Sequence, residues 1–356
     1  MTGVTLTPAE SKQKCSHMHN KHCRIRDQTA GIIDSCFFYP KIMLSYRYMS
    51  KILVTGGAGF IGSTLVDKLI SVGHEVVVID DLSSGKKEYL NTQARFYELD
   101  ICSSKIAKVF KKEKFDFVYH LAAQIDVRIS VEKPEYDNKI NVLGGLNVIE
   151  NCRLNKVKKF IMASTGGAIY GDAEEIPTPE TAPTYPVSPY GIHKLTLEKY
   201  LNYYYQVYGL NYTVLRFANV YGPRQFKGGE AGVIAIFIDN AVKNLESFQY
   251  GDGLQTRDFV YVDDVVHGLF LALNIDCRGE INIGSGIETN LLDIREGIAK
   301  ALDAPVKIKE MPAKPGEQRR SCLSYGRAQE VLNWEPQVNL EEGIKRTIKW
   351  AQNLKN

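Results

Sequence analysis

The chain has 356 residues, 44% of them hydrophobic, which is enough for one large or two smaller globular domains. Its net charge of +3 comes from basic residues spread along the chain, so the composition argues against nucleic acid or a membrane surface as a partner. No apolar run approaches the roughly 20 residues of a membrane span, and the seven cysteines are scattered and odd in number, as in proteins of the reducing cytoplasm.

Residues 1–48 differ from the rest of the chain because they show no sustained helical or strand period. The stretch Cys15–Cys23 contains cysteine and histidine side chains, but no second ligand cluster follows at the spacing of a zinc finger, so we expect no metal site. Met49 directly precedes the first predicted strand. We therefore interpret residues 1–48 as a disordered extension, or as the result of a start assigned upstream of the true one.

A glycine-rich motif follows the first strand, in the run Lys51–Gly62. Gly56 is expected to make the tight turn, Gly59 to let a pyrophosphate approach the backbone, and Gly62 to let the next helix pack on the strand. That helix offers free backbone N–H groups and the positive end of its dipole to the phosphates. The alternative is a glycine-rich turn that binds no ligand.

An acidic residue ends the second predicted strand, which covers residues 75–79. This residue, Asp80, lies at the distance from Gly62 at which a dinucleotide-binding fold holds a ribose 2′-hydroxyl. Asp81 beside it would repel a 2′-phosphate. The pattern therefore predicts NAD rather than NADP as the cofactor.

Strands and helices alternate along most of the chain, which predicts right-handed βαβ units and a parallel sheet. The expected fold is α/β, a Rossmann-type doubly wound parallel sheet with a smaller C-terminal α/β substrate domain. The strands are expected at 75–79, 95–99, 115–121, 159–163 and 212–216, and the helices near 103–112, 137–153 and 190–208.

A change of texture near residue 223 predicts a domain boundary, because glycine and proline then separate short elements. We expect residues 49–222 to form the NAD-binding domain, with 258–284 returning to it. Residues 223–257 and 285–356 would form a nucleotide-sugar-binding domain over the carboxyl ends of the strands. Within the returning segment, a helix is expected over residues 264–274, capped by Asp263.

A tyrosine and a lysine stand four residues apart at the start of a predicted long helix. Tyr190 and Lys194 therefore share a helical face, where the ammonium favours the phenolate and makes the tyrosine a general base. The strand 159–163 leads into Ser164 and Thr165, which places a hydroxyl at the carboxyl edge of the sheet, where a reacting alcohol would be held. Either feature alone is common by chance, but together they predict an active site.

Further motifs extend over nearly the whole chain after residue 48. They are Thr55–Gly62, Asp80–Gly85, Asp100-Ile101, His120–Gln124, Asn141, Tyr190-x-x-x-Lys194, Arg216–Arg224 and Arg257–Val260. With these motifs the chain resembles the extended short-chain dehydrogenases/reductases of the NAD-dependent epimerase/dehydratase type, and most of all the UDP-glucose 4-epimerases.

The resemblance implies a role for each matching residue. Tyr190 would be the catalytic base, and Lys194 would tune it and hold the nicotinamide ribose. Asn219 and Arg257 would hold the nucleotide diphosphate, with Glu317 near the uridine ribose. The residues implied to bind the cofactor are Gly56, Gly59, Phe60, Ile61, Gly62, Asp80, Asp81, Ser84, Gly85, Asp100, Ile101, Leu121, Ala122, Ala123, Gln124, Asn141, Tyr190 and Lys194. Those implied to bind the substrate are Gln124, Thr165, Asn219, Arg257, Glu317 and Ser321.

The chain departs from the pattern of the family at the catalytic hydroxyl. The family commonly places Ser or Thr where this chain has Gly166, so we expect Thr165 to supply the hydroxyl, with Ser164 as the second candidate. Near the C-terminus, Ser321 is small at a position that limits the size of the sugar in the family. A small residue there would leave room for an N-acetyl group.

The resemblance implies a 4-epimerase of a UDP-hexose of the UDP-glucose/UDP-galactose type, which works through a transient 4-keto sugar with Tyr190 as base. The alternatives are a UDP-N-acetylglucosamine or UDP-glucuronate 4-epimerase. Related dehydratases and decarboxylases usually carry acidic residues where this chain has Gly166 and Gly167, which argues against those reactions. A catalytically silent NAD-binding sensor or scaffold is expected to lose Tyr190 or Lys194, and both are present.

Two long helices of each subunit pair in dimers of this family. The resemblance therefore implies a homodimer through a four-helix bundle made by residues 137–153 and 190–208.

Overall fold

The computed structural model describes residues 49–225, 232–274, 276–313 and 318–354. The interpretation of residues 1–48, including the expectation of no metal at Cys15–Cys23, therefore lies outside the described residues. All described residues fall within a single structural unit.

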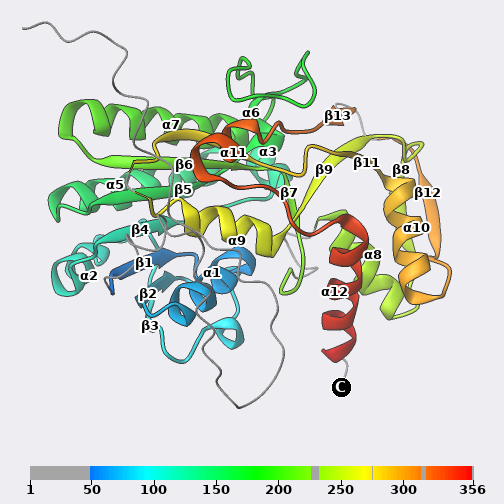
Figure 1. Ribbon diagram of the computed structural model, residues 1–356, viewed down its shortest axis with the longest axis horizontal. Helices are drawn as coiled ribbons and strands as arrows, with labels where there is room; N and C mark the ends of the chain where they lie inside the picture. Colours follow the sequence, from blue (N-terminus) through cyan, green and yellow to red (C-terminus); the bar gives the residue numbers. More distant parts are fainter. Residues whose placement is uncertain (1–48, 226–231, 275, 314–317, 355–356) are drawn as a thin grey trace, which may run out of the picture. The chain divides into compact units, whose positions relative to one another are not determined.

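A seven-stranded parallel sheet organises the larger part of the structure (Figure 1). Its order is β10-β6-β5-β4-β1-β2-β3, so the order reverses at β1, which lies between β2 and β4. Ligand crevices form outside the carboxyl ends of the strands at such a switch point. The predicted Rossmann-type α/β fold is confirmed. The strands are β1 (Lys51–Thr55), β2 (Glu75–Asp80), β3 (Arg95–Glu98), β4 (Phe117–His120), β5 (Lys159–Thr165), β6 (Asn211–Phe217) and β10 (Gly279–Ile283).

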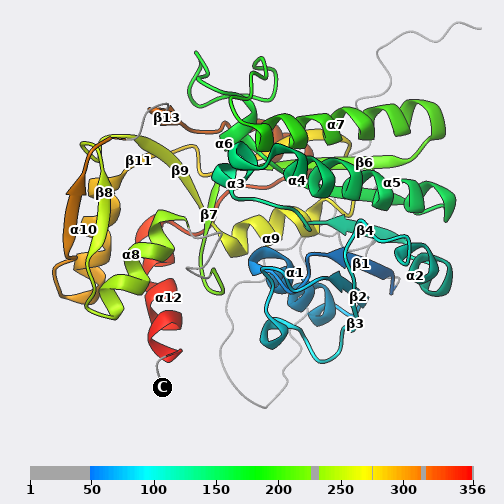
Figure 2. The same ribbon diagram turned by 180° about the vertical axis from the view of Figure 1, so that it is seen from behind.

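The strands are apolar on both faces because helices cover both sides of the sheet. In β1, Ile52 and Val54 pack into one hydrophobic cluster and Leu53 into the other, as the alternation of a strand requires. The first cluster includes residues of α1 (Phe60–Ser71), α9 (Val262–Leu271) and α11 (Gly326–Leu332). The second includes residues of α2 (Ile106–Glu113), α5 (Gly145–Leu154) and α7 (Pro189–Tyr208), and Figure 2 shows α5 and α7 side by side.

The prediction of one continuous helix over residues 137–153 is wrong. The segment is divided into α4 (Pro134–Asn138), a π-helical stretch η2 (Lys139–Gly144) and then α5, and α3 (Val127–Glu132) precedes them. The wider π turn carries Asn141, whose side-chain amide donates to the backbone O of Gln124 at 2.8 Å. π turns often occur at functional sites, and this one turns a polar side chain toward the loop after β4.

The prediction of a helix over residues 190–208 is confirmed, with Pro189 as its first residue. Ser188 caps it, because its hydroxyl accepts a hydrogen bond from the backbone N of Gly191 at 3.2 Å. Proline suits the first helical position, where the missing N–H would have no partner. These local signals place the start of α7 one residue before Tyr190.

The helix expected over residues 264–274 begins earlier, at Val262, so Asp263 lies in its first turn and does not cap it. The reason is that β9 (Thr256–Tyr261) runs directly into α9 without a loop. Both Asp263 and Asp264 then lie at the positive end of the helix dipole.

Short strands and helices make up the C-terminal part. Strand β9 is the centre of a four-stranded sheet in which it pairs with three short strands. After β9 the chain continues through α9 into β10, which pairs with β6 in the large sheet. None of the helices in the described ranges is both long and apolar enough to cross a membrane. The remaining elements are η1 (Lys87–Tyr89), α6 (Gly166–Ile169), β7 (Asn219–Tyr221), α8 (Val233–Val242), β8 (Ser247–Tyr250), β11 (Glu288–Asn290), α10 (Leu291–Leu302), β12 (Ile308–Met311), β13 (Arg320–Ser321) and α12 (Leu340–Asn353).

Candidate active site

The glycine-rich turn between β1 and α1 is closed by backbone contacts that exclude side chains. Gly56 has a φ of +72°, and a Cβ there would lie 2.6 Å from the backbone N of Ala122. A Cβ at Gly62 would lie 2.0 Å from the backbone O of Gly56. At Gly59, by contrast, a Cβ would meet only that same oxygen, at 3.2 Å. Even at Gly59 the contact would be tight, so all three positions favour glycine, and the turn leaves the backbone N–H groups at the N-terminus of α1 as the groups that could receive a phosphate.

Asp80 lies at the end of β2, beside this turn. One carboxylate oxygen accepts from the backbone N of Ala58 at 2.9 Å and the other from that of Leu82 at 2.9 Å. Burial raises the pKa of Asp80, while the two backbone hydrogen bonds act against this. Each oxygen keeps a lone pair for a ligand hydroxyl. A Cβ at Gly85 would lie 2.9 Å from Asp80 Oδ1, so this glycine also belongs to the same enclosure.

The other residues implied to bind the cofactor lie around the carboxyl ends of the first four strands. Parallel pairing aligns these ends, with Thr55 opposite both Ile79 and His120. Asp81 is exposed, and its Oδ1 accepts from the backbone N and the hydroxyl of Ser83. Phe60 and Ile61 begin α1, Ser84 follows β2, Asp100 and Ile101 follow β3, Leu121, Ala122, Ala123 and Gln124 follow β4, and Asn141 lies on η2.

Gln124, which is predicted to contact cofactor and substrate, makes several side-chain hydrogen bonds within the protein. Its Nε2 donates to the backbone O of Asp126 at 3.0 Å and to Oδ1 of Asp137 at 2.5 Å. Its Oε1 accepts from the backbone N of Asp126 at 2.6 Å. Both amide hydrogens are therefore engaged, and the side chain stabilises the loop after β4.

Lys194 lies one helical turn after Tyr190 on α7 and is buried. Burial lowers the pKa of Lys194 to about 8, while the carboxylates of Glu198 and Asp137 act in the opposite direction. Nearby, His120 ends β4, and its Nδ1 lies 2.9 Å from the hydroxyl of Thr55. Burial, together with the charge of Lys194, lowers the pKa of His120 to about 3, so this histidine is neutral.

The two adjacent hydroxyls at the end of β5 have different surroundings. The hydroxyl of Ser164 is buried and donates to Oε1 of Glu198 at 2.5 Å. The same Glu198 accepts from Nη2 of Arg216 at 2.7 Å and from its Nε at 3.2 Å. Ser164 thus belongs to a buried ion-pair network that anchors α7 to β5 and β6, and its place as the second candidate for the catalytic hydroxyl stays a prediction. Thr165 is the last residue of β5, and the turn at Gly166 and Gly167 (the glycine turn) follows it directly.

The structure explains why glycine occupies position 166. A Cβ there would lie 2.4 Å from Cδ1 of Leu323, a buried side chain from the C-terminal part. Residue 167 faces a different neighbour, because its Cβ would lie 3.4 Å from Oδ1 of Asn219 and 4.0 Å from Oγ1 of Thr165. Thr165 and Asn219 therefore lie on the same side of this turn.

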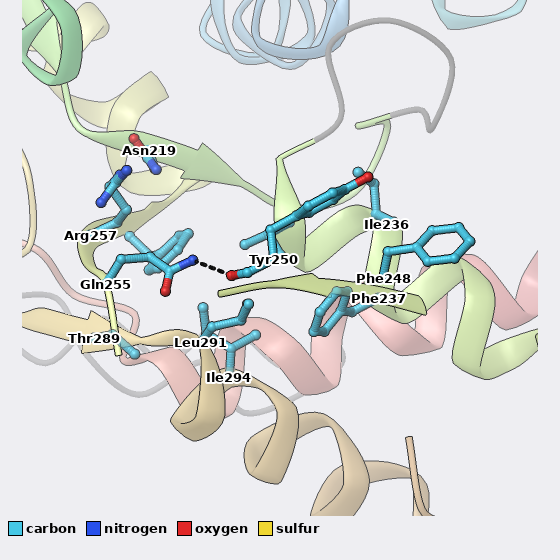
Figure 3. Close-up of a pocket in the computed structure, with 12 residues that line it drawn as sticks. Asn219, Ile236, Phe237, Phe248, Tyr250, Gln255, Arg257, Thr289, Leu291 and Ile294 are labelled. Atoms are coloured by element: carbon cyan, nitrogen blue, oxygen red, sulfur yellow. Dashed lines mark hydrogen bonds between the residues drawn. The ribbon is translucent and has the colours of Figure 1, made fainter. Parts of the chain in front are cut away.

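A cavity of about 290 Å³ opens in the C-terminal part (Figure 3). Asn219 and Arg257 lie together at one end, Gln255 and Thr289 add further polar side chains, and the other lining residues are aromatic or aliphatic. The cavity thus combines a polar end suited to phosphates with apolar walls suited to a flat ring. Its lining residues are Asn219, Val233, Ile236, Phe237, Phe248, Tyr250, Gln255, Arg257, Phe259, Thr289, Leu291 and Ile294.

The other two residues implied to bind substrate lie near the end of the chain. Ser321 on β13 stands opposite Arg257 in the register with β9, so it is next to the polar end of the cavity in the sheet. Glu317 lies outside the described residues. The structure therefore brings together Asn219, Arg257 and Ser321 in the small sheet, although they are far apart in the sequence.

Sequence reasoning missed three side chains at this site: Asp137, His193 and Leu323. His193 immediately precedes Lys194 and could have been noticed in the Tyr190–Lys194 run. Its partner, Asp137, lies on α4, and Leu323 lies after β13. No spacing rule connects positions so distant in the chain.

Comparison with known proteins places the chain in a family. The model of the NAD-dependent epimerase/dehydratase family matches residues 52–284. The chain belongs to the NAD-dependent epimerase/dehydratase family. The UDP-glucose 4-epimerase of Mycolicibacterium smegmatis is 43% identical to this chain over 309 residues, which cover 85% of this chain and 99% of that protein.

Solved structures of the family agree with this assignment. The UDP-glucose 4-epimerase of Thermotoga maritima, solved with UDP-glucose, is 46% identical, with a TM-score of 0.83 over 86% of this chain and all of that one. The UDP-glucose 4-epimerase of Thermus thermophilus, solved with NAD, is 40% identical, with a TM-score of 0.81 over 85% of this chain and 99% of that one.

Proposed function

We propose that the protein is an NAD-dependent 4-epimerase of a UDP-hexose of the UDP-glucose/UDP-galactose type. One observation carries the proposal: Asn219 lines the cavity and also lies against the turn that holds Thr165. A nucleotide bound in the cavity would therefore place its sugar toward Thr165. The similarity to UDP-glucose 4-epimerases supports the same reaction.

The cofactor would lie along the carboxyl edge of the sheet. Gly56, Gly59 and Gly62 would receive the pyrophosphate at the N-terminus of α1, and Asp80 would accept a hydrogen bond from the adenosine ribose. Lys194 would hold the nicotinamide ribose. When bound, NAD supplies a hydride acceptor that takes the hydrogen of the sugar C4 and returns it to the opposite face.

The protein side of the chemistry rests on Tyr190, Lys194 and Thr165. Tyr190 would take the proton of the 4-hydroxyl and later return it, so that the enzyme ends in its starting state. The ammonium of Lys194 favours the phenolate form of Tyr190 through its positive charge. Thr165, which the sheet fixes at the end of β5, would hydrogen-bond the reacting oxygen of the sugar.

The substrate must turn between the two halves of the reaction, so its two ends need different treatment. Asn219 and Arg257, with Glu317, would hold the nucleotide diphosphate throughout. The transient 4-keto sugar would then rotate about the diphosphate link and present its other face. A pocket that grips one end of the ligand and leaves the other free is what a 4-epimerase requires.

The glycine turn argues for epimerisation over elimination. Dehydration needs a carboxylic acid beside the leaving group, and residues 163–171 contain neither Asp nor Glu. The carboxylate of Glu198 lies below the turn, but it is buried and paired with Arg216. No acid group of this turn can therefore protonate a departing hydroxyl.

The identity of the hexose is open to a second candidate, UDP-N-acetylglucosamine. The observation that favours it is the small side chain of Ser321 beside Arg257. A larger residue there would narrow the space at the edge of the small sheet. The test below therefore includes both sugars.

We also propose a homodimer in the cytoplasm. Apolar side chains are exposed along α4, η2, α5 and α7, where the family pairs two helices of each subunit. The free thiols of Cys102, Cys152, Cys277 and Cys322 suit a reducing compartment. Light scattering of the purified protein should give the mass of two chains, and the mass of one chain would contradict the dimer. The exposed residues include Tyr136, Leu143, Leu154, Ile192, Tyr200, Tyr203 and Val207.

The experiment that tests the reaction uses purified full-length protein without added NAD. It is incubated separately with UDP-glucose, UDP-N-acetylglucosamine and UDP-glucuronate, and the anomeric protons are followed by NMR. Appearance of the galacto isomer is the expected result, and it would also show that the cofactor stays bound. No change with either sugar, or with UDP-glucuronate, even after NAD is added, would favour a sensor or scaffold. A 4-keto-6-deoxy or decarboxylated product would overturn the epimerase.

A further inference from the structure

Asp137 is a buried carboxylate on α4 to which neither the motifs nor the proposed mechanism assigns a role. One of its oxygens lies 2.5 Å from Nδ1 of His193 on α7. The other accepts from Nε2 of Gln124 at 2.5 Å and from Nδ2 of Asn141 at 3.1 Å. Burying a carboxylate is costly unless it is well hydrogen-bonded, and this one is bonded from three directions.

These contacts form one polar frame beside the part of α7 that carries Lys194. Asn141 is bound to the loop after β4 twice, because its Nδ2 donates to the backbone O of Gln124 at 2.8 Å and its Oδ1 accepts from the backbone N at 3.0 Å. His193 directly precedes Lys194 on α7. Asp137 therefore connects the lysine-bearing helix to η2 and to the loop that follows β4.

The charges around Lys194 distinguish Asp137 from its neighbours. Glu198 also raises the pKa of Lys194, but both of its oxygens are bonded to the permanent cation of Arg216. Asp137 is bonded to two neutral amides and to an imidazole. No arginine pairs with Asp137 among the described residues, and the ionisable side chain that it contacts is His193. The titratable groups that face this region are Tyr190, His193 and Glu198 on α7, Asp137 on α4 and the neutral His120 on β4.

We propose that Asp137 is a positioning residue for catalysis: its carboxylate fixes α7 through His193 and places a negative charge near the ammonium of Lys194. This inference rests on the proposed function, because it concerns the base of that reaction. Asp137 would touch neither substrate nor cofactor. It would act through Lys194, whose ammonium must persist for the phenolate of Tyr190 to form.

The substitution that tests the charge is Asp137→Asn, which keeps the size of the side chain. Without the negative charge, Lys194 should lose its proton more easily, so the alkaline limb of the kcat profile should move to lower pH by roughly one unit. The matched control is Glu135→Gln, which removes the same charge from an exposed position on the same short helix. In this control variant the alkaline limb of the kcat profile should lie at the same pH as in the wild type.

A second readout is independent of turnover. The side-chain NMR signal of Lys194, identified by its loss in Lys194→Arg, is titrated in the wild type and in Asp137→Asn without substrate. A midpoint lowered by roughly one unit in Asp137→Asn supports the proposal, even for a protein that epimerises no sugar. Failure of the reaction and failure of this inference are therefore distinguishable.

Three outcomes would overturn the inference. They are an unchanged limb and unchanged Lys194 midpoint in Asp137→Asn, an equal shift in Glu135→Gln, and a fall in kcat that is uniform across pH. His193→Asn, which keeps a donor for Asp137 and removes the imidazole, should retain the wild-type limb. If Asp137→Asn does not fold, Asp137→Glu replaces it: the limb should stay in place while kcat falls several-fold, and a shifted limb would contradict the role of the charge.

Discussion

In the parallel-sheet part of the molecule the reacting groups lie on a few long elements, whereas in the C-terminal part the cavity walls come from many short ones. Tyr190 and Lys194 are one turn apart on α7, and Thr165 ends β5. The cavity is lined mainly by residues of β7, β8, β9, β11, α8 and α10, which meet only through strand pairing and helix packing. Local geometry therefore determines the chemistry here, while long-range assembly determines substrate binding. Substitutions in the first part should therefore change kcat, and those in the second should change KM.

The largest effect is expected from Tyr190→Phe, which tests the first half of this comparison. The phenyl ring keeps the packing of α7, but the proton acceptor is lost, so kcat should fall by about 10³-fold with KM nearly unchanged. The rate is measured by NMR from the interconversion of the two UDP-sugars. Tyr208→Phe, an exposed position near the end of the same helix, is the control. A loss smaller than tenfold would place the base elsewhere.

The next largest effect is expected where Gly166 of the parallel-sheet part contacts Leu323 of the C-terminal part. Gly166→Ser should destabilise the fold by about 1–3 kcal/mol through overpacking, and Leu323→Ala by about 2–5 kcal/mol through the cavity it leaves. The double variant should lose less than the sum, because the shortened side chain makes room for the serine. Urea unfolding of the four proteins measures this coupling. Strict additivity would show that the contact does not hold glycine at position 166.

The same contrast governs how much the sequence could predict. The turn at Gly56, the strand that ends at Asp80 and the start of α7 follow from short-range rules, and the structure contains all three. The break of the helix over 137–153 could not be predicted, because it depends on the contact of Asn141 with the loop after β4. Short-range signals stop being informative where a residue's partner lies in another element.

Two residues of the site illustrate this limit. The sequence favours Thr165 over Ser164 as the catalytic hydroxyl, but the hydrogen bond between Ser164 and Glu198, on a different element, is visible only in the structure. Arg257 could be matched to the family, but the cavity beside it arises from pairing of β9 with strands both before and after it in the chain. Side-chain partners of this kind require the assembled fold.

A smaller effect is expected in the parallel-sheet part, where the pH dependence of folding stability is set in part by His120. The pKa of His120 in the folded protein is about 3, below the ordinary value of 6.5. Neutral His120 therefore contributes stability that is present above pH 6.5 and is lost as the pH falls toward 3. Between pH 6.5 and about pH 4.5 the loss should be about 2 kcal/mol.

His120→Asn removes this titration while an amide can still bond the hydroxyl of Thr55. The free energy of unfolding of the variant should fall less steeply with acid than that of the wild type. Denaturant titrations at a series of pH values measure the difference. If the free energies of unfolding of the two proteins fell equally with decreasing pH, His120 would have to be protonated, or free to become protonated, in the folded state.

The smallest effect is expected from Arg257→Lys, which tests the C-terminal half of the comparison. Lysine keeps the charge but loses the planar fork that can bind a phosphate with two parallel hydrogen bonds. KM for the UDP-sugar should rise by roughly tenfold, or about 1.4 kcal/mol, while kcat stays unchanged. Arg319→Lys, an exposed position paired with Asp252, is the matched control and should leave KM unaltered.

The ratio of the two constants in Arg257→Lys decides between two views of the cavity. If KM alone rises, the contact is equally strong before and during hydride transfer, as expected of a group that holds the end of the substrate that does not react. If kcat falls as well, the grip of Arg257 on the diphosphate also determines how the sugar reaches Tyr190. The C-terminal part would then share in the chemistry, and the division between a reacting half and a binding half would fail at the residue where the two meet.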